Sequence, residues 1–234
     1  MLDLLGFGDQ GWGDDLLAGA LLTLRIAAAS LVFGLFIGLG VAGMKLSGNA
    51  VPRAVANGYT TAIRGVPELL TLFLIYYGAQ FAVQGLFSLF GVRGAVEVNG
   101  FWAGVAALSF VFGAYASEVF RGAFLAIPKG QAEAARAIGM SPALTFRRVL
   151  LPQVWRHALP GLGNLWLVLV KDTSLVSVIA LDELLRRTNV AVGVTKEPFL
   201  FYGAACLIYL AITTVSTLVL AWLEARAARG LRRA

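Results

Sequence analysis

The chain has 234 residues, of which 59% are hydrophobic and 14% are charged. Soluble domains average about 45–50% apolar and about 25% charged residues, so this composition excludes an ordinary soluble domain and favours one integral membrane domain over residues 1–234. The formal net charge of +6 would suit a nucleic-acid-binding protein, but most of the positive residues fall in loops and near the C-terminus, where they orient a membrane protein. Cys206 is the one cysteine, so no intrachain disulfide is possible, and its apolar surroundings predict a small-residue packing role.

Five apolar segments are long enough to cross a bilayer, which requires about 20 residues. Small residues recur at every fourth position along the first segment, so they share one helix face and favour close packing against another helix. They are Ser30, Gly34, Gly38 and Ala42. The second segment is interrupted by Gly65-Val66-Pro67. The sequence therefore predicts an all-α integral membrane protein with spans at 16–44, 54–64 continued by 69–90, 101–126, 160–181 and 199–223.

A polar stretch at 127–153, which we call the elbow, separates the third and fourth apolar segments. Residues 131–138 are rich in Ala, Glu and Arg, which favour a helix, and Gly139 suits the left-handed position that ends one. Ser141 followed by Pro142 is typical of an N-cap and a first helical residue. The elbow is therefore predicted to be a helix-turn-helix.

The first helix of the elbow is expected to present a small-residue surface at Ala134 and Ala135, which lets another backbone approach closely. Pro152 is expected to limit the second helix. From its composition alone, the elbow fits equally well an amphipathic helix that lies on the inner face of the bilayer.

Five spans place the two termini on opposite sides of the membrane. With the elbow inside, the inner side also holds the basic loop 45–53 and the basic C-terminal tail, so the N-terminus is predicted outside and the C-terminus inside. The predicted outer loops hold Arg93, Arg186, Arg187 and Lys196.

Ionisable side chains in or near the spans are costly in hydrocarbon, so each should face a cavity, a partner or an interface. Glu68 follows the break at Pro67, and broken helices commonly build the binding sites of transporters. Its spacing from Arg64 equally suits an ion pair that braces the break. Glu118 is a second candidate binding residue, although it lies three residues before Arg121 and the two suit an ion pair.

Three further residues are candidates for binding a substrate. Asp172 and Thr173 lie within the fourth apolar segment, and Tyr115 offers a ring and a hydroxyl near Glu118 that suit either a core or a site. The sequence contains no His/Cys cluster for a metal and no P-loop, so we expect no metal site and no hydrolysis of nucleotide by this chain. A nucleophile–base pair is not recognisable either, so no catalytic residue is expected.

Glu133-Ala134-Ala135, with Gly139 and Leu151-Pro152 after it, resembles the EAA loop of ABC importer permeases. Taken over nearly the whole chain, the sequence is similar to the polar amino-acid uptake permeases of bacterial ABC transporters, and most like the Q-type subunit of histidine/lysine/arginine/ornithine importers. The stretches that carry this likeness are VAGMKLS (41–47), GYTTAIRGVPEL (58–69), GAYASEVFRGAFLAIPKGQ (113–131), HALPGLGNLW (157–166), KDTSLVSVI (171–179) and KEPFLFYGAACLIYLAITTVS (196–216).

The resemblance implies a type I importer fold in the bacterial inner membrane, with a periplasmic N-terminus and a cytoplasmic C-terminus. It implies two ATP-binding subunits that carry the ATP and Mg, a second permease subunit (a copy or a paralogue) and a periplasmic amino-acid-binding protein; no cofactor in this chain and no nucleic acid are expected. The elbow would be the coupling helix that docks on the ATPase, through Glu133, Ala134, Ala135 and Gly139.

The same resemblance implies a polar amino acid as cargo. Many relatives carry Leu at the position of Glu68, whereas the basic amino-acid permeases tend to have an acid there, which favours a cationic amino acid such as arginine, ornithine, lysine or histidine. Glu68, Glu118 and Asp172 are the carboxylates available to such a cargo. Glutamine, an acidic amino acid or an opine remain alternatives, as does a stand-alone channel or membrane enzyme, against which the elbow argues.

Overall fold

The computed structural model describes residues 2–8, 11–89, 99–179 and 181–228 of the protein. The regular structure of these residues is entirely helical, which confirms the predicted all-α fold. Arg93, Arg229, Arg232 and Arg233, which contributed to the predicted orientation, lie outside the described residues. The helices are α1 (Gly13–Leu46), α2 (Ala50–Gly65), α3 (Glu68–Leu89), α4 (Gly100–Leu125), α5 (Lys129–Ala137), α6 (Pro142–Thr145), α7 (Leu151–Asp172), α8 (Leu184–Thr195) and α9 (Pro198–Ala227), with 3-10 turns at Leu2–Leu5 and Thr173–Ile179 and a π turn at Phe146–Leu150.

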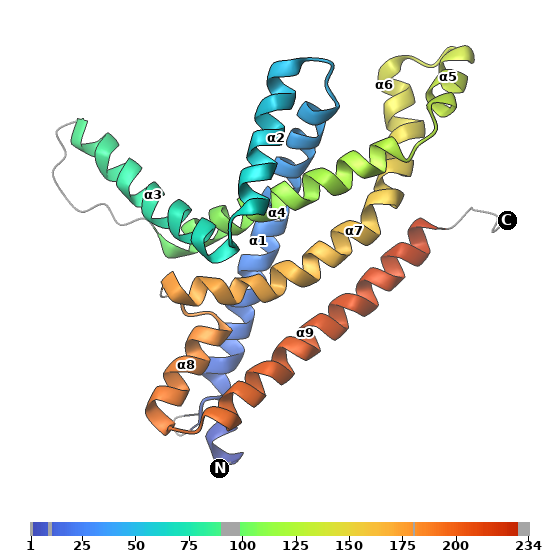
Figure 1. Cartoon of the computed structure of the whole chain (residues 1–234). Helices are drawn as coiled ribbons and strands as arrows, with labels where there is room; N and C mark the ends of the chain where they lie inside the picture. Colours follow the sequence, from blue (N-terminus) through green and yellow to red (C-terminus); the bar gives the residue numbers. More distant parts are fainter. Residues whose placement is uncertain (1, 9–10, 90–98, 180, 229–234) are drawn as a thin grey trace.

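Five helical stretches among the described residues are long and apolar enough to cross a membrane, as predicted. They are α1, α3, α4, α9 and the run from Pro142 to Ile179 that contains α7. Figure 1 shows the axes of α4, α7 and α9 tilted in a similar way, with the chain running along α7 in the opposite direction, α1 crossing behind them and the elbow helices α5 and α6 at one end.

The core lies mainly between α1 and α4, because the small residues of α1 let the two backbones come close. All four residues of the predicted small-residue face are buried. A Cβ atom added to Gly34 would lie 2.6 Å from Cδ1 of Phe112, and one added to Gly38 would lie 2.8 Å from Cβ of Ala116. A larger residue at either position would therefore push α4 away from α1.

The predicted break between α2 and α3 is confirmed. Helix α2 ends at Gly65, and Val66 has an extended backbone with φ −109° and ψ 140°. The carbonyl of Pro67 then accepts from the backbone N–H groups of Leu70 and Thr71, at 3.0 and 3.1 Å, and so starts α3. Glu68 is therefore the first residue of a new helix at the break.

The predicted turn between the two helices of the elbow is confirmed. Gly139 follows α5 and has φ +81°, a conformation that L side chains rarely adopt. The Ser141 hydroxyl then accepts from the backbone N–H of Leu144 at 3.3 Å, with Pro142 in the first turn of α6.

The predicted end of the second elbow helix at Pro152 and the start of the fourth span at residue 160 are both wrong. The π turn leads without interruption into α7, where Pro152 occupies the first turn. The π turn directly before it accommodates the proline: the N–H of Leu151 donates to the carbonyl of Phe146, five residues back, and the next residue of the run is the one that has no N–H to donate. Pro160 lies inside α7, between the buried Leu159 and Leu162, and the burial of these neighbours offsets the backbone hydrogen bond that proline removes.

Helix α8 was not predicted, because its sequence was placed in an outer loop. Glu183 is its N-cap: the carboxylate accepts from the N–H of Leu185 at 3.0 Å and of Arg186 at 2.7 Å. The same carboxylate accepts from the hydroxyls of Thr23 in α1 and Tyr209 in α9, each at 3.3 Å. Glu183 therefore joins α8 to α1 and α9.

Helix α9 contributes little to the core, since Phe201 and Ala205 are its buried residues. Cys206 is exposed on this helix, so the packing role expected for it within this chain is wrong. Apolarity of the segment indicated burial, but most of α9 faces the surroundings of the chain and not its interior.

Candidate functional site

A cavity of about 340 Å³ lies between α3, α4 and α7 and contains two carboxylates. Its polar lining comes from Glu68 at the start of α3, Tyr115 of α4, and Asn164 and Asp172 of α7. The rest of the lining is apolar, which is typical of a small-molecule site with a few polar groups that orient the ligand. We call this space the acidic cavity.

Glu68 reaches the acidic cavity because the helix break places it at the first turn of α3. A neighbouring cavity of about 530 Å³ is lined by Arg64, Glu68 and Tyr115, so it shares two residues with the acidic cavity. The Arg64 guanidinium lies 5.4 Å from the centroid of the Tyr115 ring. The ion pairs of the described residues do not include Glu68 with Arg64, although their spacing allowed such a brace.

Asp172 and Thr173 are adjacent in sequence but have different environments. Asp172 ends α7 and lines the acidic cavity. Thr173 is fully buried and donates its hydroxyl to the carbonyl of Val170 at 2.7 Å. Consecutive side chains of a helix point about 100° apart, and Thr173 does not line the acidic cavity.

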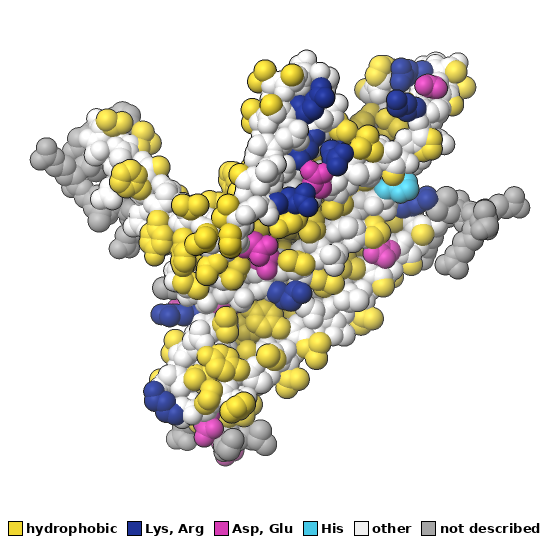
Figure 2. All heavy atoms as spheres, in the orientation of Figure 1, with side chains coloured by type: hydrophobic (Ala, Val, Ile, Leu, Met, Phe, Trp, Pro, Cys, Tyr) yellow, Lys and Arg dark blue, Asp and Glu magenta, His cyan; other side chains and the backbone are white. Residues whose placement is uncertain are grey.

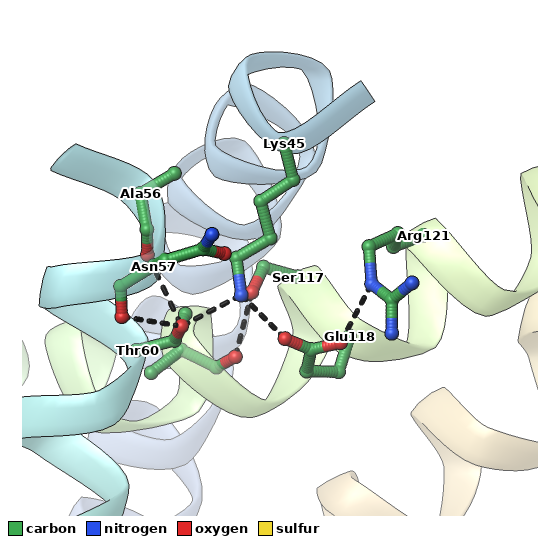
Figure 3. A network of polar contacts seen from close by, with 8 residues as sticks. Lys45, Ala56, Asn57, Thr60, Ser117, Glu118 and Arg121 are labelled. Atoms are coloured by element: carbon green, nitrogen blue, oxygen red, sulfur yellow. Dashed lines mark hydrogen bonds and ion pairs between the residues drawn. The ribbon is translucent and has the colours of Figure 1, made fainter. Parts of the chain in front are cut away.

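Glu118 belongs to a separate network of charges between α1, α2 and α4 (Figure 3). Its carboxylate forms an ion pair with Lys45 and accepts from Nε of Arg121 at 2.8 Å. Lys45 also donates to the hydroxyl of Thr60 at 2.6 Å, and its side chain is only 5% exposed. The ion pair of Glu118 with Arg121 that the sequence suggested is thus present. The ion pair of Glu118 with Lys45 was not predicted, because the two residues lie 73 positions apart in the sequence.

The negative charge of Glu118 is therefore balanced by two cations, and this residue lines a third cavity with Lys45 and Arg64 instead of the acidic cavity. Glu68 and Asp172 take part in none of the ion pairs found among the described residues. Two carboxylates that face one cavity without an ion-pair partner favour a negative field there, which a cationic ligand would complement.

The elbow residues that were expected to contact the ATPase differ in their exposure to the surroundings of the chain. Glu133, Ala134 and Gly139 are exposed, but Ala135 is buried against the chain itself, so the expected small-residue surface does not include it. Ile138 is 75% exposed and adds an apolar side chain to the elbow. Figure 2 shows Lys and Arg side chains over α2 and over the elbow, at the same end of the molecule.

The family model described as "Binding-protein-dependent transport system inner membrane component" matches residues 30–229. The nopaline transport system permease protein NocQ of Agrobacterium fabrum is 47% identical, over 99% of this chain and 98% of the relative. The octopine transport system permease protein OccQ of Agrobacterium tumefaciens is 45% identical, over 98% of this chain and 97% of the relative. The histidine/lysine/arginine/ornithine transport system permease protein HisQ of Escherichia coli is 45% identical, over 96% of this chain and 98% of the relative.

Solved structures agree with this relationship. The crystal structure of an amino acid ABC transporter with histidines contains a chain that is 33% identical, with a TM-score of 0.78 over 92% of this chain and 95% of that chain. The MetNI methionine ABC transporter in an inward-facing conformation shares the fold at 18% identity, with a TM-score of 0.78 over 95% of this chain.

The resemblance read from the elbow and the flanking stretches is confirmed, and family membership agrees with the expectation that this chain is not itself an enzyme. The chain is a multi-pass inner-membrane permease subunit of an amino-acid ABC importer, and it belongs to the family of binding-protein-dependent transport system inner membrane components.

Proposed function

We propose that the permease carries a cationic amino acid (arginine, ornithine, lysine or histidine) and that the acidic cavity binds it. The observation that supports this most is the pair of carboxylates, Glu68 and Asp172, facing one cavity of about 340 Å³ without a paired cation. A guanidinium or ammonium side chain forms charge-assisted hydrogen bonds with such groups. Tyr115 and Asn164 add a ring face and an amide that orient the ligand.

Transport proceeds by alternating access in this proposal. Two ATP-binding subunits, which hold the ATP and Mg, dock on the elbow and move it as they close, through the exposed Glu133, Ala134 and Gly139. Because α6 continues through the π turn into α7, a displacement of α6 reaches Asp172 along a single helical run. A periplasmic binding protein delivers the amino acid, and a second permease subunit, a copy or a paralogue, completes the pathway.

The chain lies with its N-terminus in the periplasm and its C-terminus in the cytoplasm. The basic side chains over α2 and the elbow support this orientation, since cytoplasmic loops carry an excess of Lys and Arg (Figure 2).

An opine is the second candidate cargo, because the relatives that carry octopine and nopaline in their names are 45% and 47% identical to this chain. An opine such as octopine or nopaline carries at least one more carboxylate than the amino acid from which it is built. Arg64 lines the cavity next to the acidic cavity, over Tyr115, and would meet that carboxylate.

Uptake by the reconstituted complex tests the cationic cargo. Vesicles that contain the permease with its partners should accumulate labelled arginine or lysine, and Glu68→Gln should lower this uptake about tenfold or more, because a charge-assisted contact contributes about 1.5–3 kcal/mol. Asp172→Asn should act in the same direction. Uptake is normalised to assembled complex, and Asp182→Asn, which removes an exposed carboxylate outside the acidic cavity, is the matched control.

Normal uptake per complex in Glu68→Gln would remove this residue from the site. The opine would be assigned as cargo instead by two results together. Octopine would compete with arginine at similar concentration, and Arg64→Gln would lose the uptake of octopine alone.

A further inference from the structure

A second cavity, of about 360 Å³, opens between α1, α7 and α9 and is almost wholly apolar. Trp155 and Trp166 of α7, Val219 and Leu223 of α9 and Leu35 of α1 are among its lining residues. The residues that line it and those that line the acidic cavity do not overlap, so α7 separates the two spaces. We call this second space the α7–α9 groove.

The length of the α7–α9 groove along α7 is similar to the thickness of the hydrocarbon part of one lipid leaflet. Along α7 the groove extends from Trp155 to Trp166, which is eleven steps along the helix, or about 16 Å at 1.5 Å per residue. Half of the hydrocarbon core of a bilayer is about 15 Å. The groove begins at the end of α7 that adjoins the elbow, so it fits an acyl chain that enters from that face of the membrane.

The elbow end of the groove carries aromatic and cationic side chains. Trp155 and Trp222 are both half-exposed there, as is usual for tryptophan at a membrane interface. Arg226 lies one turn beyond Leu223 with its guanidinium 5.5 Å from the centroid of the Trp222 ring, and Arg156 directly follows Trp155. Glu224 is an exposed carboxylate near the same end, so the two arginines leave an excess of one positive charge there.

We propose that the α7–α9 groove binds an acyl chain of an anionic glycerophospholipid from the leaflet on the elbow side, with the lipid phosphate at Arg156 and Arg226. The walls match the hydrocarbon chain, and a guanidinium pairs with phosphate through two parallel hydrogen bonds. A helix of a partner protein is the alternative occupant, and the arginines at the elbow end favour the lipid, because they complement a phosphate. The lipid would fill the space between α7, which leads to the elbow, and the otherwise poorly packed α9.

Quenching of tryptophan fluorescence by brominated lipids tests the proposal. The full chain keeps Trp166, deep in the groove, as its single tryptophan after Trp→Phe at positions 12, 102, 155 and 222. It is reconstituted in phosphatidylcholine vesicles that contain either brominated phosphatidylglycerol or brominated phosphatidylcholine. We expect the anionic lipid to have a relative binding constant at least roughly fivefold higher, since each arginine near the surface contributes a factor of about five.

Variants separate the groove from the general surface charge. Arg156→Gln and Arg226→Gln should each lower the preference for the anionic lipid several-fold, whereas Arg53→Gln, which removes an exposed arginine at the start of α2, should leave it unchanged. Glu224→Gln should raise the preference, a gain that misfolding would not produce. Val219→Phe should reduce quenching by both lipids, because the ring fills the groove.

Three outcomes of these experiments would contradict the proposal. Equal quenching by the two lipids would show that the groove has no headgroup preference. A preference that falls as much in Arg53→Gln as in Arg226→Gln would show only general attraction to the surface. No quenching by either lipid would mean that protein covers the groove.

Discussion

The buried charges between α1, α2 and α4 predict an asymmetry between two mutants that remove the two halves of one ion pair. Lys45 is 5% exposed and has two partners, Glu118 and the Thr60 hydroxyl. Glu118 is 27% exposed and has a second cation, Arg121 at 2.8 Å. Loss of Glu118 therefore leaves a buried ammonium without a counter-charge, whereas loss of Lys45 leaves a carboxylate that is still paired and partly solvated.

We expect Glu118→Met to lower the free energy of unfolding by about 3 kcal/mol, the low end for breaking a buried pair, because water reaches part of the site. Lys45→Met should cost only about 1 kcal/mol, since a methionine of similar length fills the space of the lysine stem. The double variant should lie within about 1 kcal/mol of the unchanged protein, because two apolar side chains replace a buried ion pair with little loss.

Reversible unfolding of the full chain in mixed detergent micelles, followed by tryptophan fluorescence, measures these three free energies. Uptake per assembled complex is measured on the same variants. If Lys45→Met costs as much as Glu118→Met and the double variant adds the two losses, the pair does not stabilise the packing as argued. If the double variant is stable but its uptake per complex falls about tenfold, Glu118 contacts the substrate and the acidic cavity is incomplete as described.

Three further predictions concern the elbow, the orientation and the cap of α8. Gly139→Val forces a β-branched residue to φ +81°, a strain of about 1–2 kcal/mol, so the permease should still insert but lose substrate-stimulated ATP hydrolysis; full stimulation would refute docking through this turn. Asn49→Cys in a Cys206→Ser background should resist an impermeant thiol reagent added to intact cells, and labelling from outside would reverse the orientation. Burial raises the pKa of the Glu183 carboxyl above its usual 4.5, so stability that is present below that pH is lost as the pH rises through the raised pKa. Thermal unfolding from pH 4.5 to about pH 7.5 should show this loss, and Glu183→Gln should abolish it; an unchanged pH dependence in that variant would assign it to another group.

Sequence reasoning predicted the features that depend on neighbouring residues. The lengths of the apolar segments identified five spans, and the four-residue spacing in α1 identified the face that packs on α4. The break at Pro67, the left-handed Gly139 and the Ser141 cap follow from backbone chemistry within a few positions, so they too were predicted correctly. The same local rules failed at Pro160, where the burial of α7 offsets the cost of a proline inside the helix.

Helix α8 and the pairing of the charges depend on residues that are distant in sequence. The N-cap of α8 is Glu183, whose carboxylate also accepts a hydrogen bond from Thr23, 160 positions earlier. The start of α8 therefore depends in part on a contact that the local sequence does not reveal. As sequence positions, Glu118 and Asp172 were both carboxylates available to a cationic substrate, although Glu118 also suited an ion pair with Arg121. Helix packing separates them, because it brings Lys45, 73 positions away, to Glu118 and brings Glu68 to the cavity of Asp172.

The sequence alone thus determined that this chain spans a membrane, breaks its second span and carries an elbow typical of importer permeases, since each of these rests on a pattern within a few turns of chain. Only the tertiary structure decided which carboxylates have a cationic partner. That pairing requires a cation within about 4 Å, and in this protein those distances are set by how α1, α2, α4 and α7 pack.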